Sequence, residues 1–111
     1  MTITPVVGMG CTKICGSDRY ALTIVEIVRE NEIICTIDNV VANKTKDNTM
    51  GHQNWILTPN PNGERVIVKC NRLGQWFVAN KTEKGLWSVS AKHRGSPVIL
   101  GERRYYYDWS F

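Results

Sequence analysis

The chain lacks any long apolar run. None of its hydrophobic stretches approaches the roughly 20 residues that a membrane-spanning helix needs. Residues 1–10 have neither the basic start nor the apolar stretch of a secretory signal. We therefore expect a protein of the cytoplasm that does not insert into a membrane.

Motifs of catalysis and of metal binding are also missing. The two histidines, His52 and His93, stand at no metal-ligand spacing, and Cys11 and Cys15 form a C-x₃-C pair without a matching second pair. The sequence Gly8-Met9-Gly10 lacks the third glycine and the Lys-Ser/Thr of phosphate-binding loops. The carboxylates are scattered, so no pair is indicated for acid–base chemistry. The sequence predicts no metal, no cofactor and no enzymatic activity.

The length and composition of the chain indicate a single folded domain. With 111 residues, of which 42% are hydrophobic and 22% charged, the chain has the size and composition of a single domain, which we place at 1–111. Three of the four cysteines stand among or beside β-branched residues, which favours reduced thiols that act as small hydrophobic groups. The cysteines are Cys11, Cys15, Cys35 and Cys70.

Two dense runs of β-branched residues open the predicted sheet. Residues 20–29 and 32–38 flank the polar pair Glu30-Asn31 and predict a hairpin, although residues 20–30 also fit a helical period. Residues 41–51 lack periodicity and predict a solvated loop. Residues 54–58, 65–70 and 75–78 predict a three-stranded meander, in which Asn62-Gly63 supplies the positive φ angles of a tight turn.

Short apolar pieces at 86–90, 97–100 and 104–107 each have the length of one strand. Seven to nine short strands and no convincing helix predict an all-β fold, a single small barrel or sandwich. The opening hairpin and the loop after it favour an SH3-like barrel, by analogy only.

Positive charge is concentrated in the second half of the chain. Residues 1–55 hold five Lys and Arg against six Asp and Glu, whereas residues 56–111 hold nine against four. Such a surplus forms either a positive face for an anionic partner or a scatter of solvated lysines.

Two basic turns are candidate anion sites. In Gly16-Ser17-Asp18-Arg19-Tyr20, the Arg19 guanidinium could bind an anionic or planar group, or simply pair with a carboxylate. In residues 92–96, His93 and Arg94 could lie over a phosphate if Gly95 leaves backbone amides accessible.

The C-terminus combines arginines with aromatic rings. Arg103 and Arg104 directly precede Tyr105, Tyr106 and Tyr107, an arrangement suited to stacking on a nucleotide or base. The alternative is a final strand whose rings close one end of the barrel. In a strand, Arg103, Tyr105 and Tyr107 would share one face, and Arg104 and Tyr106 the other.

A pattern spread over both ends of the chain carries a resemblance. Its parts are Val7-Gly8-Met9-Gly10, then Gly16 to Tyr20 leading into Thr23-Ile-Val-Glu-Ile27, and finally Tyr105-Tyr-Tyr-Asp-Trp-Ser-Phe111. This pattern resembles small phage- and prophage-encoded proteins of unassigned function. The resemblance implies a viral accessory protein acting in the bacterial cytoplasm, and it brings no catalytic residues.

From these features we expect a non-enzymatic phage accessory protein that inhibits or sequesters a host defence component. Its partner would be a host protein or a nucleotide-like anionic signal, and self-association stays open. The alternative is a nucleic-acid-binding accessory protein that uses the basic C-terminal half. A small hydrolase or transferase is a third class, for which the sequence offers no motif.

Overall fold

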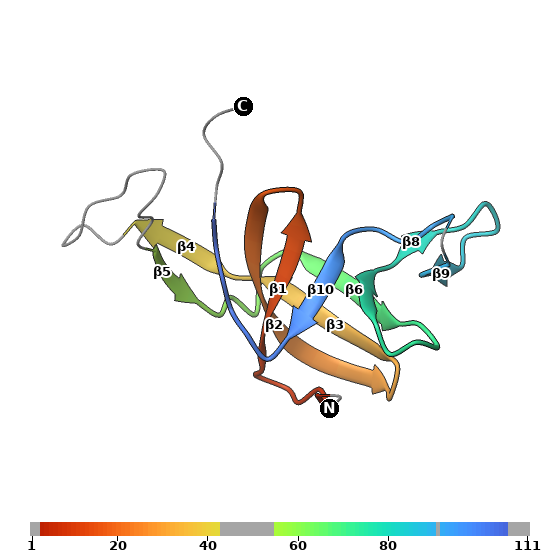
Figure 1. Cartoon of the computed structure of the whole chain (residues 1–111). Coiled ribbons are helices and arrows are strands. Elements are labelled where there is room, and N and C mark those ends of the chain that lie inside the picture. Colours follow the sequence, from red (N-terminus) through yellow and green to blue (C-terminus); the bar gives the residue numbers. More distant parts are fainter. Residues whose placement is uncertain (1–2, 43–54, 91, 107–111) are drawn as a thin grey trace.

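The described residues of the computed structural model, 3–42, 55–90 and 92–106, form strands, turns and extended segments and contain no helix. The ten strands (Figure 1) are β1 (Gly10–Cys15), β2 (Asp18–Arg29), β3 (Glu32–Ile37), β4 (Asn39–Ala42), β5 (Trp55–Thr58), β6 (Arg65–Cys70), β7 (Trp76–Val78), β8 (Asn80–Lys81), β9 (Trp87–Ser88) and β10 (Pro97–Leu100). The all-β prediction is confirmed, with more strands than the seven to nine expected. No helix in the described part of the chain has the length and apolar character needed to cross a membrane.

Six of these strands close into an antiparallel barrel in the order β1-β10-β7-β6-β3-β2. The first and last strands of the barrel pair with each other, with Cys11 opposite Leu100. Closure leaves none of these six strands with an unpaired edge along the sheet. The small barrel predicted from the sequence is therefore present, whereas its SH3-like variant stays a prediction.

The strongest local prediction to be confirmed is the hairpin of β2 and β3. Both strands have the expected β-branched runs, the turn falls at Glu30-Asn31, and Ile27 lies opposite Ile33. The register shifts between Ile24 and Glu26, where an extra residue bends the long strand β2. This bend lets β2 pair with β1 at its first half and with β3 at its second half.

The predicted meander is wrong in its first pairing. Strand β5 pairs with β4, placing Ile56 opposite Val41, whereas β6 pairs with β3 and β7. Gly63 does not have a positive φ angle. A Cβ atom on Gly63 would lie 2.5 Å from the backbone oxygen of Ile37, so close approach of the chain, not a tight hairpin, requires glycine there. Of the predicted loop 41–51, Val41 and Ala42 belong to β4, and the remainder lies outside the described residues.

The core fills the barrel with aliphatic side chains and thiols. Leu22, Ile24, Ile33 and Val68 are almost fully buried, and Cys11 and Cys35 lie among them. All four cysteines are free thiols. A hydrogen bond with Cys11, together with burial, raises the pKa of the Cys35 thiol. Cys11 and Cys35 therefore serve as small core residues, as the sequence predicts, whereas Cys15 and Cys70 are half-buried.

Candidate ligand-binding site

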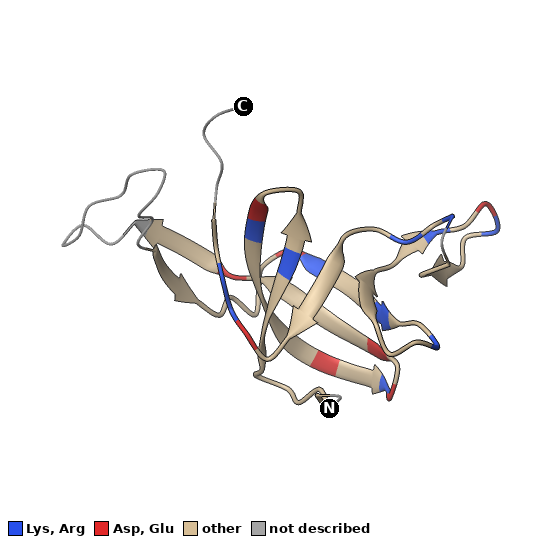
Figure 2. Ribbon diagram, viewed as in Figure 1, with Lys and Arg blue, Asp and Glu red and all other residues tan. Residues whose placement is uncertain are grey.

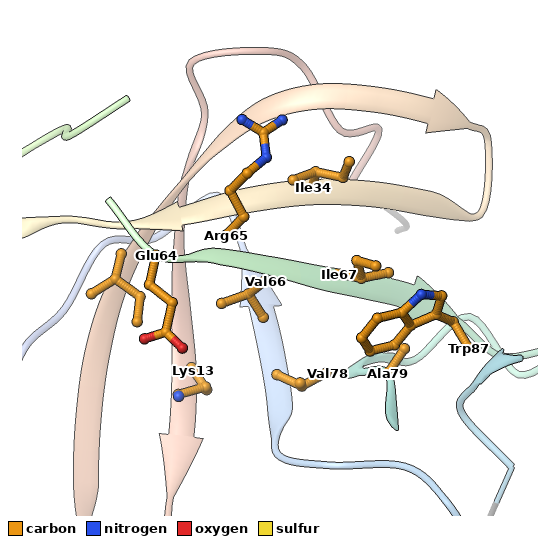
Figure 3. A pocket seen from close by; sticks show the side chains of 10 residues that line it. Lys13, Ile34, Glu64, Arg65, Val66, Ile67, Val78, Ala79 and Trp87 are labelled. Carbon is orange, nitrogen blue, oxygen red and sulfur yellow. The ribbon is translucent and has the colours of Figure 1, made fainter. Parts of the chain in front are cut away.

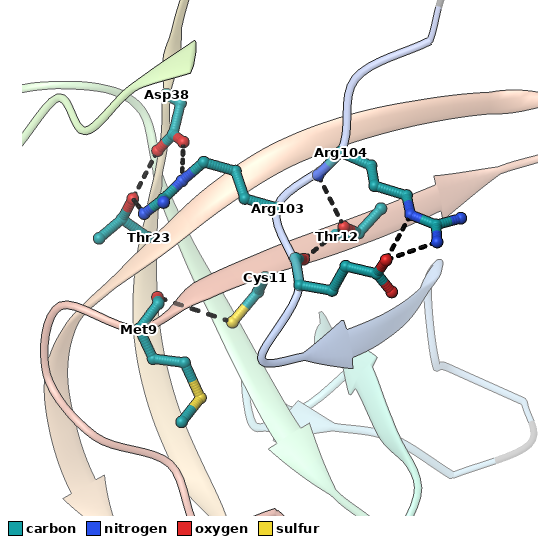
Figure 4. Close-up of polar contacts among 8 residues, drawn as sticks. Met9, Cys11, Thr12, Thr23, Asp38, Arg103 and Arg104 are labelled. Carbon is teal, nitrogen blue, oxygen red and sulfur yellow. Dashed lines mark hydrogen bonds and ion pairs between the residues drawn. The ribbon is translucent and has the colours of Figure 1, made fainter.

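The chain crosses the outside of the barrel after β10, and hydrogen bonds to β1 fasten this C-terminal segment, residues 102–106, and the turn before it (Figure 4). The Gly101 N–H donates to the Gly10 oxygen over 2.9 Å. The Thr12 hydroxyl donates to the Glu102 oxygen over 2.6 Å and accepts from the Arg104 N–H over 3.0 Å. A buried threonine of β1 thus satisfies two backbone groups of a segment that the sequence assigned to a strand.

The Arg103 side chain is fixed by hydrogen bonds to Asp38 and Thr23. Its Nε donates to Asp38 Oδ2 over 2.6 Å, and its Nη2 donates to Thr23 Oγ1 over 2.8 Å. The Thr23 hydroxyl in turn donates to Asp38 Oδ1 over 2.6 Å, and the Asp38 side chain is 0% exposed. Arg103 neutralises a buried carboxylate, so its main role is to hold the segment, although it was predicted as a ligand-binding residue.

Gly10 makes room for this arginine. A Cβ atom at residue 10 would lie 2.9 Å from both Cβ and Cζ of Arg103. The close packing explains why a glycine opens β1 at the point where Arg103 passes over it.

The tyrosines that follow have mainly structural contacts. The Tyr105 ring packs edge-on against Tyr20 at 6.0 Å and against Trp55 at 5.0 Å between centroids. Tyr106 and Arg19 exchange both backbone hydrogen bonds at 2.9 Å, an isolated bridge in place of the predicted strand 104–107. Tyr107 lies outside the described residues. The packing role predicted for these rings is therefore present at Tyr105, whereas ligand contact stays a prediction.

These contacts surround a hollow of about 470 Å³ between the C-terminal segment, the β1–β2 turn and β5. We call it the arginine–tyrosine hollow. It is lined by Ser17, Arg19, Trp55, Leu57, Arg103, Arg104, Tyr105 and Tyr106. Five of the eight predicted binding residues meet here, although Arg19 is far from the others in the sequence. Ser17 belongs to the candidate turn that the sequence indicated, whereas sequence reasoning missed Trp55 and Leu57, because both reach the hollow through the unforeseen β4–β5 pairing.

Arg19 differs electrostatically from the other two arginines. Its Nη1 donates to the backbone oxygens of Gly16, over 2.8 Å, and Asp18, over 2.9 Å. Within the described part of the chain it has no carboxylate at ion-pair distance, whereas Arg103 pairs with Asp38 and Arg104 with Glu102. The guanidinium is therefore positioned by carbonyl groups while its positive charge is not neutralised by an ion pair.

A neighbouring phenol stays neutral beside this cation. Burial, followed by the Asp18 carboxylate, raises the pKa of Tyr20 above its usual value. Tyr20 consequently contributes an uncharged ring to the packing under Tyr105 at physiological pH.

His93 and Arg94 lie elsewhere, in the turn after β9. The N–H groups of both residues donate to the Ser90 oxygen, and the Gly95 N–H donates to the Val78 oxygen over 2.7 Å. These amides are already used, which overturns the expectation that Gly95 leaves them accessible to a phosphate. The Arg94 guanidinium stacks over the Phe77 ring at 4.6 Å from its centroid.

A second cavity of about 420 Å³ opens beside β6 (Figure 3). Its lining combines aliphatic side chains with charged residues at the rim and the indole of Trp87. The lining residues are Lys13, Ile34, Ile37, Glu64, Arg65, Val66, Ile67, Val78, Ala79 and Trp87. The sequence analysis nominated none of these for binding, because they come from five separate strands and segments that only the barrel brings together.

Neither a metal centre nor a relative identifies the site. No three His, Cys, Asp or Glu side chains within residues 3–42, 55–90 and 92–106 are grouped to hold a metal ion. The chain matches no protein-family model, and comparison with curated proteins and with solved structures gives no match. Functional assignment therefore depends on the chemistry of the cavities among the described residues.

Proposed function

We propose that this protein is a non-enzymatic binding protein that captures an anionic ligand with a planar ring, such as a nucleotide, in the arginine–tyrosine hollow. The observation that carries the proposal is the position of Arg19, a cation without a carboxylate partner in the described chain, beside Trp55 and Tyr106 in one hollow.

The chemistry of the lining fits such a ligand. A guanidinium makes strong, charge-assisted hydrogen bonds to phosphate or carboxylate oxygens, and indole and phenol rings pack against planar groups. Because two backbone oxygens already orient Arg19, little side-chain entropy is lost on binding. A volume of about 470 Å³ lies within the ordinary range of small-molecule pockets.

The same lining supports binding in preference to catalysis. Among the described lining residues it offers guanidinium groups, aromatic rings, one leucine and one serine. Guanidinium groups stay protonated at neutral pH, so they hold an anion and do not act as a general base.

The resemblance to phage and prophage proteins gives this binding a biological setting. A small phage protein that sequesters a nucleotide signal, or that docks on a host effector, would block host defence without any chemical reaction. We therefore extend the proposal to an anti-defence accessory protein of the bacterial cytoplasm.

Replacing Arg19 tests the proposal. Titration calorimetry with AMP, ATP, cyclic di-AMP and inorganic phosphate should show binding of at least one nucleotide, and Arg19→Ala should weaken it by about tenfold or more, since a charge-assisted hydrogen bond is lost. Arg29→Ala is the matched control, because Arg29 is an exposed arginine at the β2–β3 hairpin that pairs with Glu32. The proposal fails if none of the nucleotides binds, or if Arg19→Ala binds them as tightly as the unchanged protein.

A further inference from the structure

A two-stranded arm projects from the barrel on the side opposite the β4–β5 ribbon (Figure 1), and it carries an exposed large aromatic side chain. Trp87 is 41% exposed and lies on β9, in the two-stranded arm formed by β8 and β9. Its cross-strand partner Lys81 places Nζ 5.2 Å from the indole centroid, and Lys69 Nζ donates to the Trp87 backbone oxygen over 3.3 Å. Two lysines from different strands thus hold this ring and its backbone.

The indole forms one wall of the second cavity, which we call the Trp87 groove (Figure 3). Ile34 and Ile67, cross-strand partners on β3 and β6, supply an apolar surface next to it. Arg65 lies on the same groove and, within the described residues, makes a long, exposed ion pair with Glu26, at 3.6 Å. An aromatic wall, an apolar surface and three charged residues, the cations Lys13 and Arg65 and the anion Glu64, therefore meet in one concavity.

Basic residues are frequent from β6 to the turn after β9, which includes strands beside the groove (Figure 2). Residues 69–94 contain one acidic residue, Glu83, and six basic ones. The basic residues are Lys69, Arg72, Lys81, Lys84, Lys92 and Arg94. The pair formed by Lys92 and Glu83 is 3.9 Å long between side chains that are mostly exposed, so it neutralises little charge. Glu64 lines the groove and Glu32 pairs with Lys69 at 3.9 Å, so part of the positive charge is offset, but residues 72–94 hold five basic residues against Glu83 alone, a surplus that favours a polyanion.

We propose that the Trp87 groove binds single-stranded nucleic acid, with a base against the Trp87 indole and neighbouring phosphates near Arg65, Lys69 and Lys81. Proteins that bind single strands combine an aromatic stacking surface with a cationic track for the backbone, and both are present here. A duplex keeps its bases stacked inside and cannot place one in the groove. This binding does not depend on the nucleotide site at Arg19.

The test is fluorescence anisotropy with a labelled oligothymidylate of ten nucleotides, in low and in physiological salt. Trp87→Ala should weaken binding by roughly fivefold to a hundredfold, whereas Trp87→Phe should keep most of the affinity, because stacking on a ring is retained. Lys81→Met should lower the slope of log affinity against log salt by about 0.7, the contribution of one phosphate contact on a single strand.

Two controls make the outcome specific. Leu86→Ala alters an exposed side chain of the same arm and should leave the oligonucleotide affinity unchanged. Arg19→Ala should also leave it unchanged while weakening nucleotide binding, so the two proposals can fail separately. Thermal melts show whether each variant is folded. Equal affinity of folded Trp87→Ala and unchanged protein, or equal affinity for a duplex of the same length, would overturn the inference.

Discussion

Two buried threonines show that a single hydroxyl can either stabilise or destabilise this fold. Thr12 and Thr36 are 2% and 0% exposed. The Thr12 hydroxyl makes two hydrogen bonds to the C-terminal segment, whereas the Thr36 hydroxyl has no hydrogen-bond partner within the described chain. A buried hydroxyl without a partner costs free energy that a methyl group of the same size does not.

We therefore expect opposite effects from the same substitution. Thr12→Val leaves the Glu102 oxygen and the Arg104 N–H without their partner and should lower the free energy of unfolding by about 1–3 kcal/mol. Thr36→Val should leave it unchanged or raise it by up to about 1 kcal/mol. Urea denaturation followed by tryptophan fluorescence measures both. A loss of stability in Thr36→Val equal to that in Thr12→Val would contradict the assignment.

At the scale of elements, the β4–β5 ribbon links the fold to the arginine–tyrosine hollow. Its two strands pair only with each other, and an isolated two-stranded ribbon is marginally stable in water. Trp55 on β5 packs against Tyr105 of the C-terminal segment, with ring centroids 5.0 Å apart. This contact joins an element outside the barrel to a segment fastened on it.

Removing the contact should loosen the ribbon and leave the barrel intact. In Trp55→Ala, the amides of Val41 and Ile56 should exchange their hydrogens much faster, because the ribbon loses the packing that holds it. The amides of Ile33 and Val68, in the barrel core, should keep their protection. Hydrogen exchange followed by mass spectrometry separates these regions, and uniform loss of protection would show that the ribbon and the barrel unfold as one unit.

The elements also show what the sequence could and could not predict. The β2–β3 hairpin was predictable, because two β-branched runs and a short polar turn are local signals. The partner of β5 was not, because β5 pairs with a strand that precedes the predicted loop, and no local turn signal encodes that choice. The signal at Asn62-Gly63 does mark a turn, since the Gly63 N–H donates to the Asn60 oxygen over 2.9 Å, but this turn does not pair β5 with β6, and no local signal shows the close approach of Gly63 to Ile37.

Some residues of the candidate site could also be predicted from the sequence, and others could not. The combination of arginine and tyrosine at the C-terminus indicated the hollow, and the Arg19 turn indicated the other side of it. The internal role of Arg103 was hidden, because Asp38 becomes its buried partner only when β3 and the C-terminal segment meet. Trp87 carried no signal in the sequence, because its surroundings of Lys69, Lys81 and Ile67 come from separate strands.

At the scale of the whole molecule, the barrel closes between the two ends of the chain. Cys11 on β1 lies opposite Leu100 on β10, whereas Ile33 on β3 faces its own hairpin partner Ile27. Closing a long loop costs entropy before its contacts can compensate, so proteins dominated by distant strand pairs fold in milliseconds to seconds. We expect the hairpin to form early and the β1–β10 seam to form late.

Two core truncations of similar size test this order. Ile33→Ala and Leu100→Ala each remove a buried aliphatic side chain and should cost about 2–5 kcal/mol of unfolding free energy. If the hairpin is structured in the transition state, Ile33→Ala slows refolding, whereas Leu100→Ala leaves the refolding rate nearly unchanged and accelerates unfolding. Stopped-flow refolding and unfolding in urea measure both rates. Slower refolding of Leu100→Ala, by the same factor as Ile33→Ala, would contradict this order. It would mean that the contacts between β1 and β10 are already formed in the transition state, so the barrel closes before or together with the hairpin.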